Sequence, residues 1–191
     1  MTLEFRKIKR SEIRQAAELA ARSFDDYEYF TNWFPDKETR NAFQLSAILH
    51  EYRTNFGRAE YLMASQDSQM VAVCQLNPPS YRKPSGLSYL LHGWLNVFKT
   101  GEKELIDKWL EMDAAAGRPC HEYQKKGPGI WYASSLTVDP LLNVFFLTAF
   151  PQYSLNAWKT GVSGFLEKPL NADNLRSQLA RLRRPIEGVS V

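Results

Sequence analysis

The dipeptide Asp139-Pro140 divides the chain into two parts whose hydrophobic patterns differ. Before it, short stretches of strand-like alternation are separated by stretches in which apolar residues recur at helical spacing. After it, residues 143–150 form a continuous apolar run, as expected for a strand that is covered on both faces of a parallel sheet. The two patterns together predict an α/β protein, and 191 residues are enough to bury a core.

The first part is expected to contain strands and helices in a definite order. Strands are predicted at residues 3–8, 60–66, 70–77 and 130–138, and the middle two are predicted to form a hairpin. Helices are predicted at residues 11–24, 37–56, 87–98 and 102–116, followed by a loop at 118–128. An aromatic stretch, which includes Phe30, Trp33 and Phe34, connects the first two helices.

Charge and hydropathy exclude several classes of protein. The net charge of +3 is small and dispersed, which does not favour nucleic-acid binding. No apolar run approaches the ~20 residues of a membrane span, and residues 1–10 do not resemble a signal peptide. We therefore expect a cytoplasmic protein that binds neither nucleic acid nor membrane. The oligomeric state stays open.

The two cysteines do not predict a metal site. Cys74 lies in an apolar, strand-like run and is expected to be a small core residue. Cys120, His121 and Glu122 are three potential ligands in a row, but adjacent residues rarely converge on one ion. No partner pair at metal-ligand spacing occurs elsewhere, so no metal is expected.

The order of these elements up to residue 140 resembles the GNAT family of N-acetyltransferases. Residues 5–8 and 13–20 resemble the first strand and helix of that family, and residues 61–64 and 71–76 resemble its second and third strands. The strongest match is the segment Trp131-Tyr132-Ala133-Ser134-Ser135-Leu136-Thr137-Val138-Asp139-Pro140, which resembles the fourth strand.

This resemblance implies a mixed sheet of GNAT type, a cofactor and a reaction. The cofactor would be acetyl-CoA, and the backbone of Leu136, Thr137 and Val138 would line its pantetheine arm. The reaction would be acetylation of a small-molecule or peptide amine.

The acceptor side of such a site is less defined. By the resemblance, Phe30, Trp33 and Phe34 would face the acceptor amine; the alternative is that these aromatic residues only hold two helices together. Glu28, Glu60 and Glu122 are candidate general bases by residue type alone, so the catalytic base stays unknown.

The phosphate-binding loop of the family is missing from the sequence. In the family, glycines after the fourth strand let backbone N–H groups approach the pyrophosphate. Here Pro140 leads into an apolar run, and no glycine occurs between Gly129 and Gly161. Two outcomes therefore stay open, an active acetyltransferase or a relative that has lost the activity.

Residues 141–185 resemble the closing part of a receiver domain from LytTR-type response regulators. The predicted elements are a strand at 143–150, a helix at 152–160, a strand at 164–167 and a helix at 172–183. In a receiver, Thr148 and Lys168 would contact a phosphoryl group and Phe165 would be the switch aromatic residue. The acidic residues that would hold Mg²⁺ cannot be placed, so structural roles are the alternative.

The two resemblances predict a GNAT-like part at residues 1–140 and a receiver-like part at 141–191. We expect one mixed sheet, completed or extended by the β-α-β-α tail, with helices on both faces. Three functions stay open: an N-acetyltransferase-like protein, a non-catalytic regulatory or binding module with a receiver-like tail, and an engineered or accidental fusion that lacks either activity.

Overall fold

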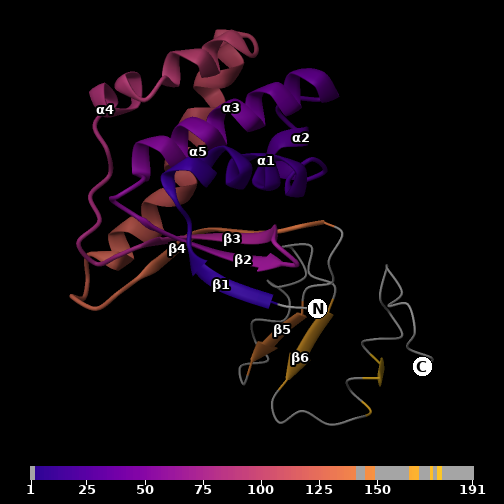
Figure 1. Ribbon diagram of the computed structural model, residues 1–191. Coiled ribbons are helices and arrows are strands. Elements are labelled where there is room, and N and C mark those ends of the chain that lie inside the picture. Colours follow the sequence, from indigo (N-terminus) through magenta and orange to yellow (C-terminus); the bar gives the residue numbers. More distant parts are fainter. Residues whose placement is uncertain (1–2, 141–144, 149–163, 168–172, 174–175, 178–191) are drawn as a thin grey trace. The chain divides into compact units, whose positions relative to one another are not determined.

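The computed structural model describes residues 3–140, 145–148, 164–167, 173 and 176–177 (Figure 1). The chain forms two compact units, Met1–Asp139 and Pro140–Val191. The boundary between them falls at the dipeptide where the hydrophobic pattern of the sequence changes.

The first unit contains a four-stranded antiparallel sheet in the order β1-β2-β3-β4. Its strands are Leu3–Lys7, Glu60–Gln66, Gln69–Asn77 and Tyr132–Val138. The hairpin turn between β2 and β3 places Asp67 and Ser68 at φ angles of 48° and 69°, a region that short polar residues tolerate in tight turns. The four strands predicted for this part of the chain are confirmed.

Three helices connect β1 to β2 after a short 3-10 turn, η1 (Arg10–Glu12). They are α1 (Ile13–Ser23), α2 (Glu28–Thr31) and α3 (Lys37–Asn55). Asp36 caps α3 by accepting a hydrogen bond from the backbone N–H of Thr39 at 2.8 Å. Helices α1 and α3 lie on one side of the sheet (Figure 1).

One core lies between these helices and the sheet. Ala16, Ala17 and Leu19 of α1 recur at helical spacing and are buried against Met63 and Val73 of the strands. The other face of the sheet carries exposed apolar side chains, with Phe5 74% exposed and Leu136 51% exposed. The helices of the first unit therefore cover one face of the sheet.

An insertion between β3 and β4 contains α4 (Gly86–Leu91), η2 (Trp94–Lys99) and α5 (Lys103–Gln124). It forms a second core with α2 and α3, built from Phe30, Phe34, Phe43, Ala47, Val97, Ile106 and Trp109. The predicted helices at 87–98 and 102–116 are thus present, the first of them divided at Gly93.

The predicted loop at 118–128 is wrong for its first half, because α5 continues through Pro119 to Gln124. The Gln124 amide donates to the backbone carbonyls of Asn77 at 2.9 Å and Pro78 at 2.8 Å. The ring of His121 packs on Tyr81. These tertiary contacts stabilise the last turns of the helix, although Pro119 has a low helix propensity.

In the second unit, β5 (Phe145–Thr148) and β6 (Gly164–Glu167) pair in parallel. Both predicted strands are confirmed, and they pair with each other in a two-stranded sheet. The single mixed sheet expected from the sequence stays a prediction. The predicted helix at 152–160 lies outside the described residues, as does most of the one at 172–183. Within the described ranges, no helix has the length and apolar character needed to cross a bilayer.

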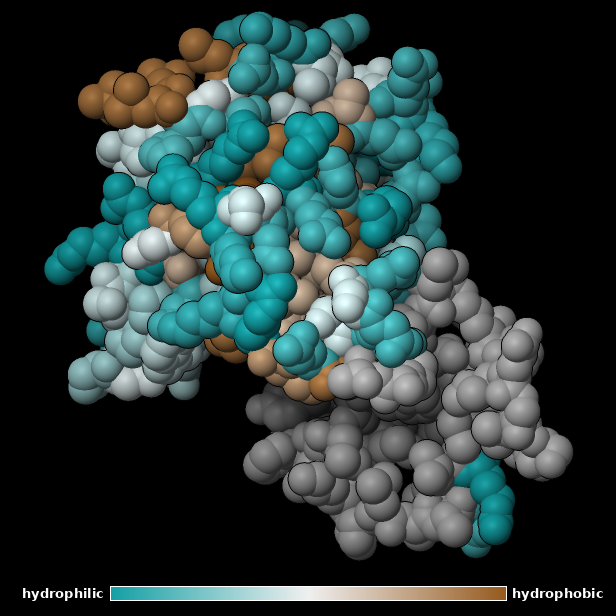
Figure 2. Space-filling model, in the orientation of Figure 1, coloured by the Kyte–Doolittle hydropathy of each residue, from teal (hydrophilic) through white to brown (hydrophobic). Residues whose placement is uncertain are grey.

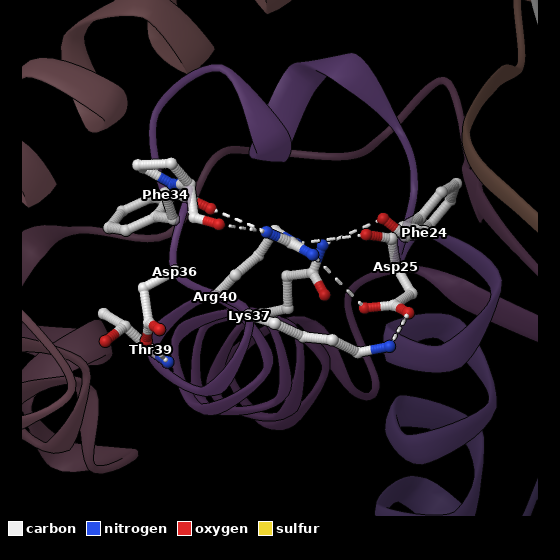
Figure 3. A network of polar contacts seen from close by, with 9 residues as sticks. Phe24, Asp25, Phe34, Asp36, Lys37, Thr39 and Arg40 are labelled. Carbon is white, nitrogen blue, oxygen red and sulfur yellow. Dashed lines mark hydrogen bonds and ion pairs between the residues drawn. The ribbon is translucent and has the colours of Figure 1, made fainter.

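A buried arginine holds the connection between α1 and α3. The Arg40 guanidinium donates to the carbonyls of Asp25 at 3.1 Å, Phe34 at 2.8 Å and Pro35 at 3.2 Å (Figure 3). It also lies 3.8 Å from the Asp25 carboxylate, which pairs with Lys37 at 3.0 Å. Because guanidinium has five N–H donors in one plane, a single side chain satisfies several carbonyls of this connection.

We expect Arg40→Met to lower the free energy of unfolding by about 2 kcal/mol, because three carbonyls lose their donor. Urea denaturation followed by circular dichroism measures this loss. Lys37→Met is the control, since it breaks an exposed ion pair to the same Asp25 and is expected to cost less than about 1 kcal/mol. Equal losses in the two variants would contradict the role of Arg40.

Candidate functional site

The outer edge of β4 presents backbone groups that no described strand pairs with. The N–H of Asp139 donates to the Val71 carbonyl at 2.7 Å, so Thr137 and Ser135, which continue the same register, bond to β3 up to the bulge opposite Gln75. By alternation, the backbone groups of Leu136 and Val138 point away from β3. The Val138 carbonyl accordingly accepts a hydrogen bond from the Ser23 hydroxyl at 2.7 Å.

The three residues predicted to line the pantetheine arm are therefore differently placed. Thr137 bonds to β3 and its side chain is 1% exposed, in the core beneath the helices. Leu136 and Val138 present their backbone N–H groups at the outer edge, together with the Leu136 carbonyl. An extended ligand that carries amides can pair with such an edge as an added strand does.

Of the three aromatic residues predicted to face the acceptor, Phe30 and Phe34 are buried and Trp33 is partly buried. Phe30 and Phe34 are 6% and 1% exposed, and the Phe34 ring stacks on Phe43 with 4.2 Å between ring centroids. The Trp33 indole N–H lies 3.1 Å from the Met112 sulfur. This packing agrees with the alternative that they hold helices together, and it leaves Phe30 and Phe34 little surface for an acceptor.

A carboxyl group of α3 lies among tyrosine side chains. The Glu51 carboxylate accepts a hydrogen bond from the side-chain NH₂ group of Asn55 at 2.6 Å. The Tyr81 hydroxyl donates to the side-chain oxygen of Asn55 at 2.8 Å. Glu51 also shares a hydrogen bond with Tyr89, and its charge acts on Tyr61. We call these five residues the Glu51 cluster.

Burial raises the pKa of Glu51 to about 7, and the negative charge of Asp113 adds to the effect. Burial, reinforced by the Glu51 charge, also raises the pKa of Tyr81 to about 12. The tyrosines are therefore neutral near pH 7, whereas Glu51 exchanges its proton there. A carboxyl group that titrates at the working pH can serve as a general base.

The C-terminal end of α5 lies next to this cluster. The His121 ring stacks on Tyr81 at 6.1 Å between ring centroids and meets Tyr132, the first residue of β4, edge-on at 5.5 Å. Burial lowers the pKa of His121. Its neighbours Cys120 and Glu122 are exposed, and the described residues contain no group of three or more potential metal-ligating side chains.

The candidate bases named from the sequence lie elsewhere. Glu28 is exposed in α2, Glu122 is exposed on α5, and Glu60 forms an ion pair with Lys7 at 3.0 Å. Glu51 was missed, because one acidic residue among many on a helix carries no signal of its own. Its position beside Tyr52, at the margin of the apolar face of α3, is the only sequence feature that could have suggested it.

The receiver-like positions are described only in part. Thr148 is the last residue of β5 and pairs with Glu167, and Phe165 pairs with Phe146. Lys168 lies outside the described residues. Phosphoryl contacts of these residues therefore stay a prediction.

No protein-family model matches the chain, and a search of characterised proteins found no match. The function proposed below therefore depends on residues and geometry.

We expect Glu51→Gln to stabilise the protein at high pH only. The pKa of Glu51 is about 7 in the folded state against 4.5 without burial, so folded protein binds this proton more tightly than unfolded protein. Stability is therefore lost as the pH rises from 4.5 to 7, by about 2 kcal/mol after allowance for solvent. The variant, which has no such proton, should gain that amount at pH 8 and nothing at pH 4.

Urea denaturation at both pH values measures this difference. The control is Glu122→Gln, which removes an exposed carboxyl group and should change the free energy of unfolding by less than about 0.5 kcal/mol at pH 4 and at pH 8. A gain in Glu51→Gln that is the same at pH 4 and pH 8 would refute the shifted pKa.

Proposed function

We propose that the first unit is an N-acyltransferase of the GNAT type. It binds acetyl-CoA, or a related acyl-pantetheine thioester, along the outer edge of β4 and transfers the acyl group to an amine. The observation that carries this proposal is the outward-facing backbone of Leu136 and Val138 on an edge strand.

The chemistry of the pantetheine arm fits this edge. The arm is extended and contains two amide groups, so it can both donate and accept hydrogen bonds. The outer edge of β4 offers the N–H groups of Leu136 and Val138 and the carbonyl of Leu136. Binding of this kind needs no particular side chain at these positions, because main-chain hydrogen bonds provide the affinity.

Acyl transfer also needs a group that removes a proton from the acceptor. The amine nitrogen attacks the thioester carbonyl, the C–N bond forms, the C–S bond breaks, and the thiolate leaves and is protonated. Glu51 takes the proton that the amine loses, because its pKa of about 7 lets it accept a proton at neutral pH. The Tyr89 hydroxyl hydrogen-bonds to this carboxyl group, and the Tyr81 hydroxyl donates to Asn55, which in turn donates to Glu51.

The lack of glycine after Pro140 has a consequence for affinity. Without a loop that cradles the pyrophosphate, binding depends on the pantetheine arm and the thioester. S-acetylpantetheine, which has no phosphate groups, should then bind about as tightly as acetyl-CoA.

We expect Leu136→Pro to weaken acetyl-CoA binding roughly ten-fold, because proline removes the outward N–H of Leu136. The β3–β4 pairing survives, since proline is tolerated where the N–H of an edge strand faces away from the sheet. Leu136→Ala keeps the N–H and is the matched control. Calorimetric titration measures affinity, and circular dichroism checks the fold. The absence of binding to the native protein at millimolar acetyl-CoA would refute the proposal.

We expect acetyl transfer to an amine to increase with pH through about 7 and Glu51→Gln to lower the rate about 100-fold. Thiol release from acetyl-CoA, measured across pH 5.5–8.5, follows the reaction. The profile of Glu51→Gln should lack the inflection near pH 7 and follow only the titration of the acceptor amine, and Glu122→Gln should match the native protein. A native pH profile retained by Glu51→Gln would exclude Glu51 as the base.

A further inference from the structure

The first unit contains a basic pocket of about 490 Å³. Its walls come from η1 and α1, from the C-terminal half of α3, and from the end of α4 through to η2. Three arginines, Arg10, Arg14 and Arg53, line it together with His50 and His92, and no carboxylate does. The pocket shares no residue with the outer edge of β4 or with the Glu51 cluster.

The positive charge of this pocket is largely uncompensated. Arg14 forms an ion pair with Glu18 at 3.0 Å. In the part of the chain that the structure describes, neither Arg10 nor Arg53 forms an ion pair. Three cations on one concave surface repel one another, and their combined field favours an anion.

The histidines are held in one orientation. His50 is 4% exposed, and its Nδ1 lies 2.7 Å from the His92 carbonyl oxygen. The Nδ1 of His92 lies 2.6 Å from the Ser88 carbonyl oxygen. Since a carbonyl oxygen can only accept, each Nδ1 carries the proton and donates it.

The backbone of Gly93 lies against the His50 ring, at a position where only glycine fits. Gly93 has a φ of +91°, and a Cβ atom there would lie 2.7 Å from the Cε1 atom of His50. Only glycine adopts this conformation readily and also permits so close an approach. The shape of the pocket therefore follows from a specific backbone path between α4 and η2.

We propose that this pocket binds a phosphate group of a ligand. The planar guanidinium fork matches two phosphate oxygens at once, which makes arginine the preferred partner of phosphate. The amide of Asn96 and the hydroxyl of Ser11, which also line the pocket, add neutral donors. A volume of about 490 Å³ leaves room for a pyrophosphate or for a larger molecule that carries a phosphate group.

The phosphate can come from a soluble compound or from a lipid headgroup. Leu87, Leu90, Leu91 and Leu95 are 47% to 77% exposed, and Leu91 lines the pocket itself. Figure 2 shows apolar side chains gathered at the end of the molecule where Figure 1 labels α4. Exposed leucines beside arginines also suit an anionic membrane surface, so the experiment must separate the two sources.

The first arm titrates the full chain with inorganic pyrophosphate in a calorimeter. We expect binding, and we expect Arg53→Gln and Arg10→Gln each to weaken it about ten-fold through loss of a charge-assisted hydrogen bond. Arg82→Gln removes the same charge from an exposed residue outside the pocket and should change affinity less than about two-fold.

The second arm mixes the protein with phosphatidylcholine vesicles that contain or lack phosphatidic acid and measures co-sedimentation. Pyrophosphate binding that depends on Arg53 assigns the pocket to soluble phosphate compounds. Sedimentation with phosphatidic acid that depends on Arg53, without pyrophosphate binding, assigns it to a lipid headgroup. No binding in either arm, or equal losses in Arg53→Gln and Arg82→Gln, would overturn the proposal. Neither arm contains a thioester, so the result is independent of acyl transfer.

Discussion

The structure of the first unit depends on the burial of one guanidinium group. Arg40 satisfies the carbonyls of Asp25, Phe34 and Pro35, which lie at the two ends of the connection between α1 and α3. That connection follows Ser23, whose hydroxyl bonds to the Val138 carbonyl at the outer edge of β4. The position of α1 against the edge strand, and with it the access to that edge, therefore depends on the path that Arg40 holds in place.

Helix α3 contributes to two different sites because of its periodicity. Residues three or four apart share a face of a helix, so Glu51 and Asn55 lie together, as do His50 and Arg53. The first pair faces tyrosines, whose bulk removes water and raises the pKa of the Glu51 carboxyl group. The second pair faces Arg10 and Arg14 of the neighbouring turn and helix. Adjacent residues thus produce a proton-exchanging carboxyl group on one side and an anion-attracting pocket on the other.

Local patterns predicted most of the secondary structure of the first unit. They failed where tertiary contacts determine whether a segment is helical or a side chain is buried. Alternation along β2 and β3 correctly predicted the hairpin, because one face of each strand is buried. Pro119 suggested a loop, but the hydrogen bonds of Gln124 maintain the helix beyond it. The family resemblance placed Phe30 and Phe34 at a binding surface, with helix packing as the alternative, and their rings fill a core shared with α5. Composition does not distinguish an aromatic core from an aromatic pocket.

The sequence by itself determined the order of the elements, the change of pattern at Asp139-Pro140, and the lack of glycine where a phosphate-binding loop would stand. These features depend on residue type and on spacing along the chain, which can be read without a fold. Only the tertiary structure decided that Glu51 is enclosed by tyrosines, that Arg10 and Arg53 share one pocket, and that Leu136 and Val138 face outward. A pKa, a local field and an open strand edge depend on distances between residues that are remote in sequence, and folding alone sets those distances.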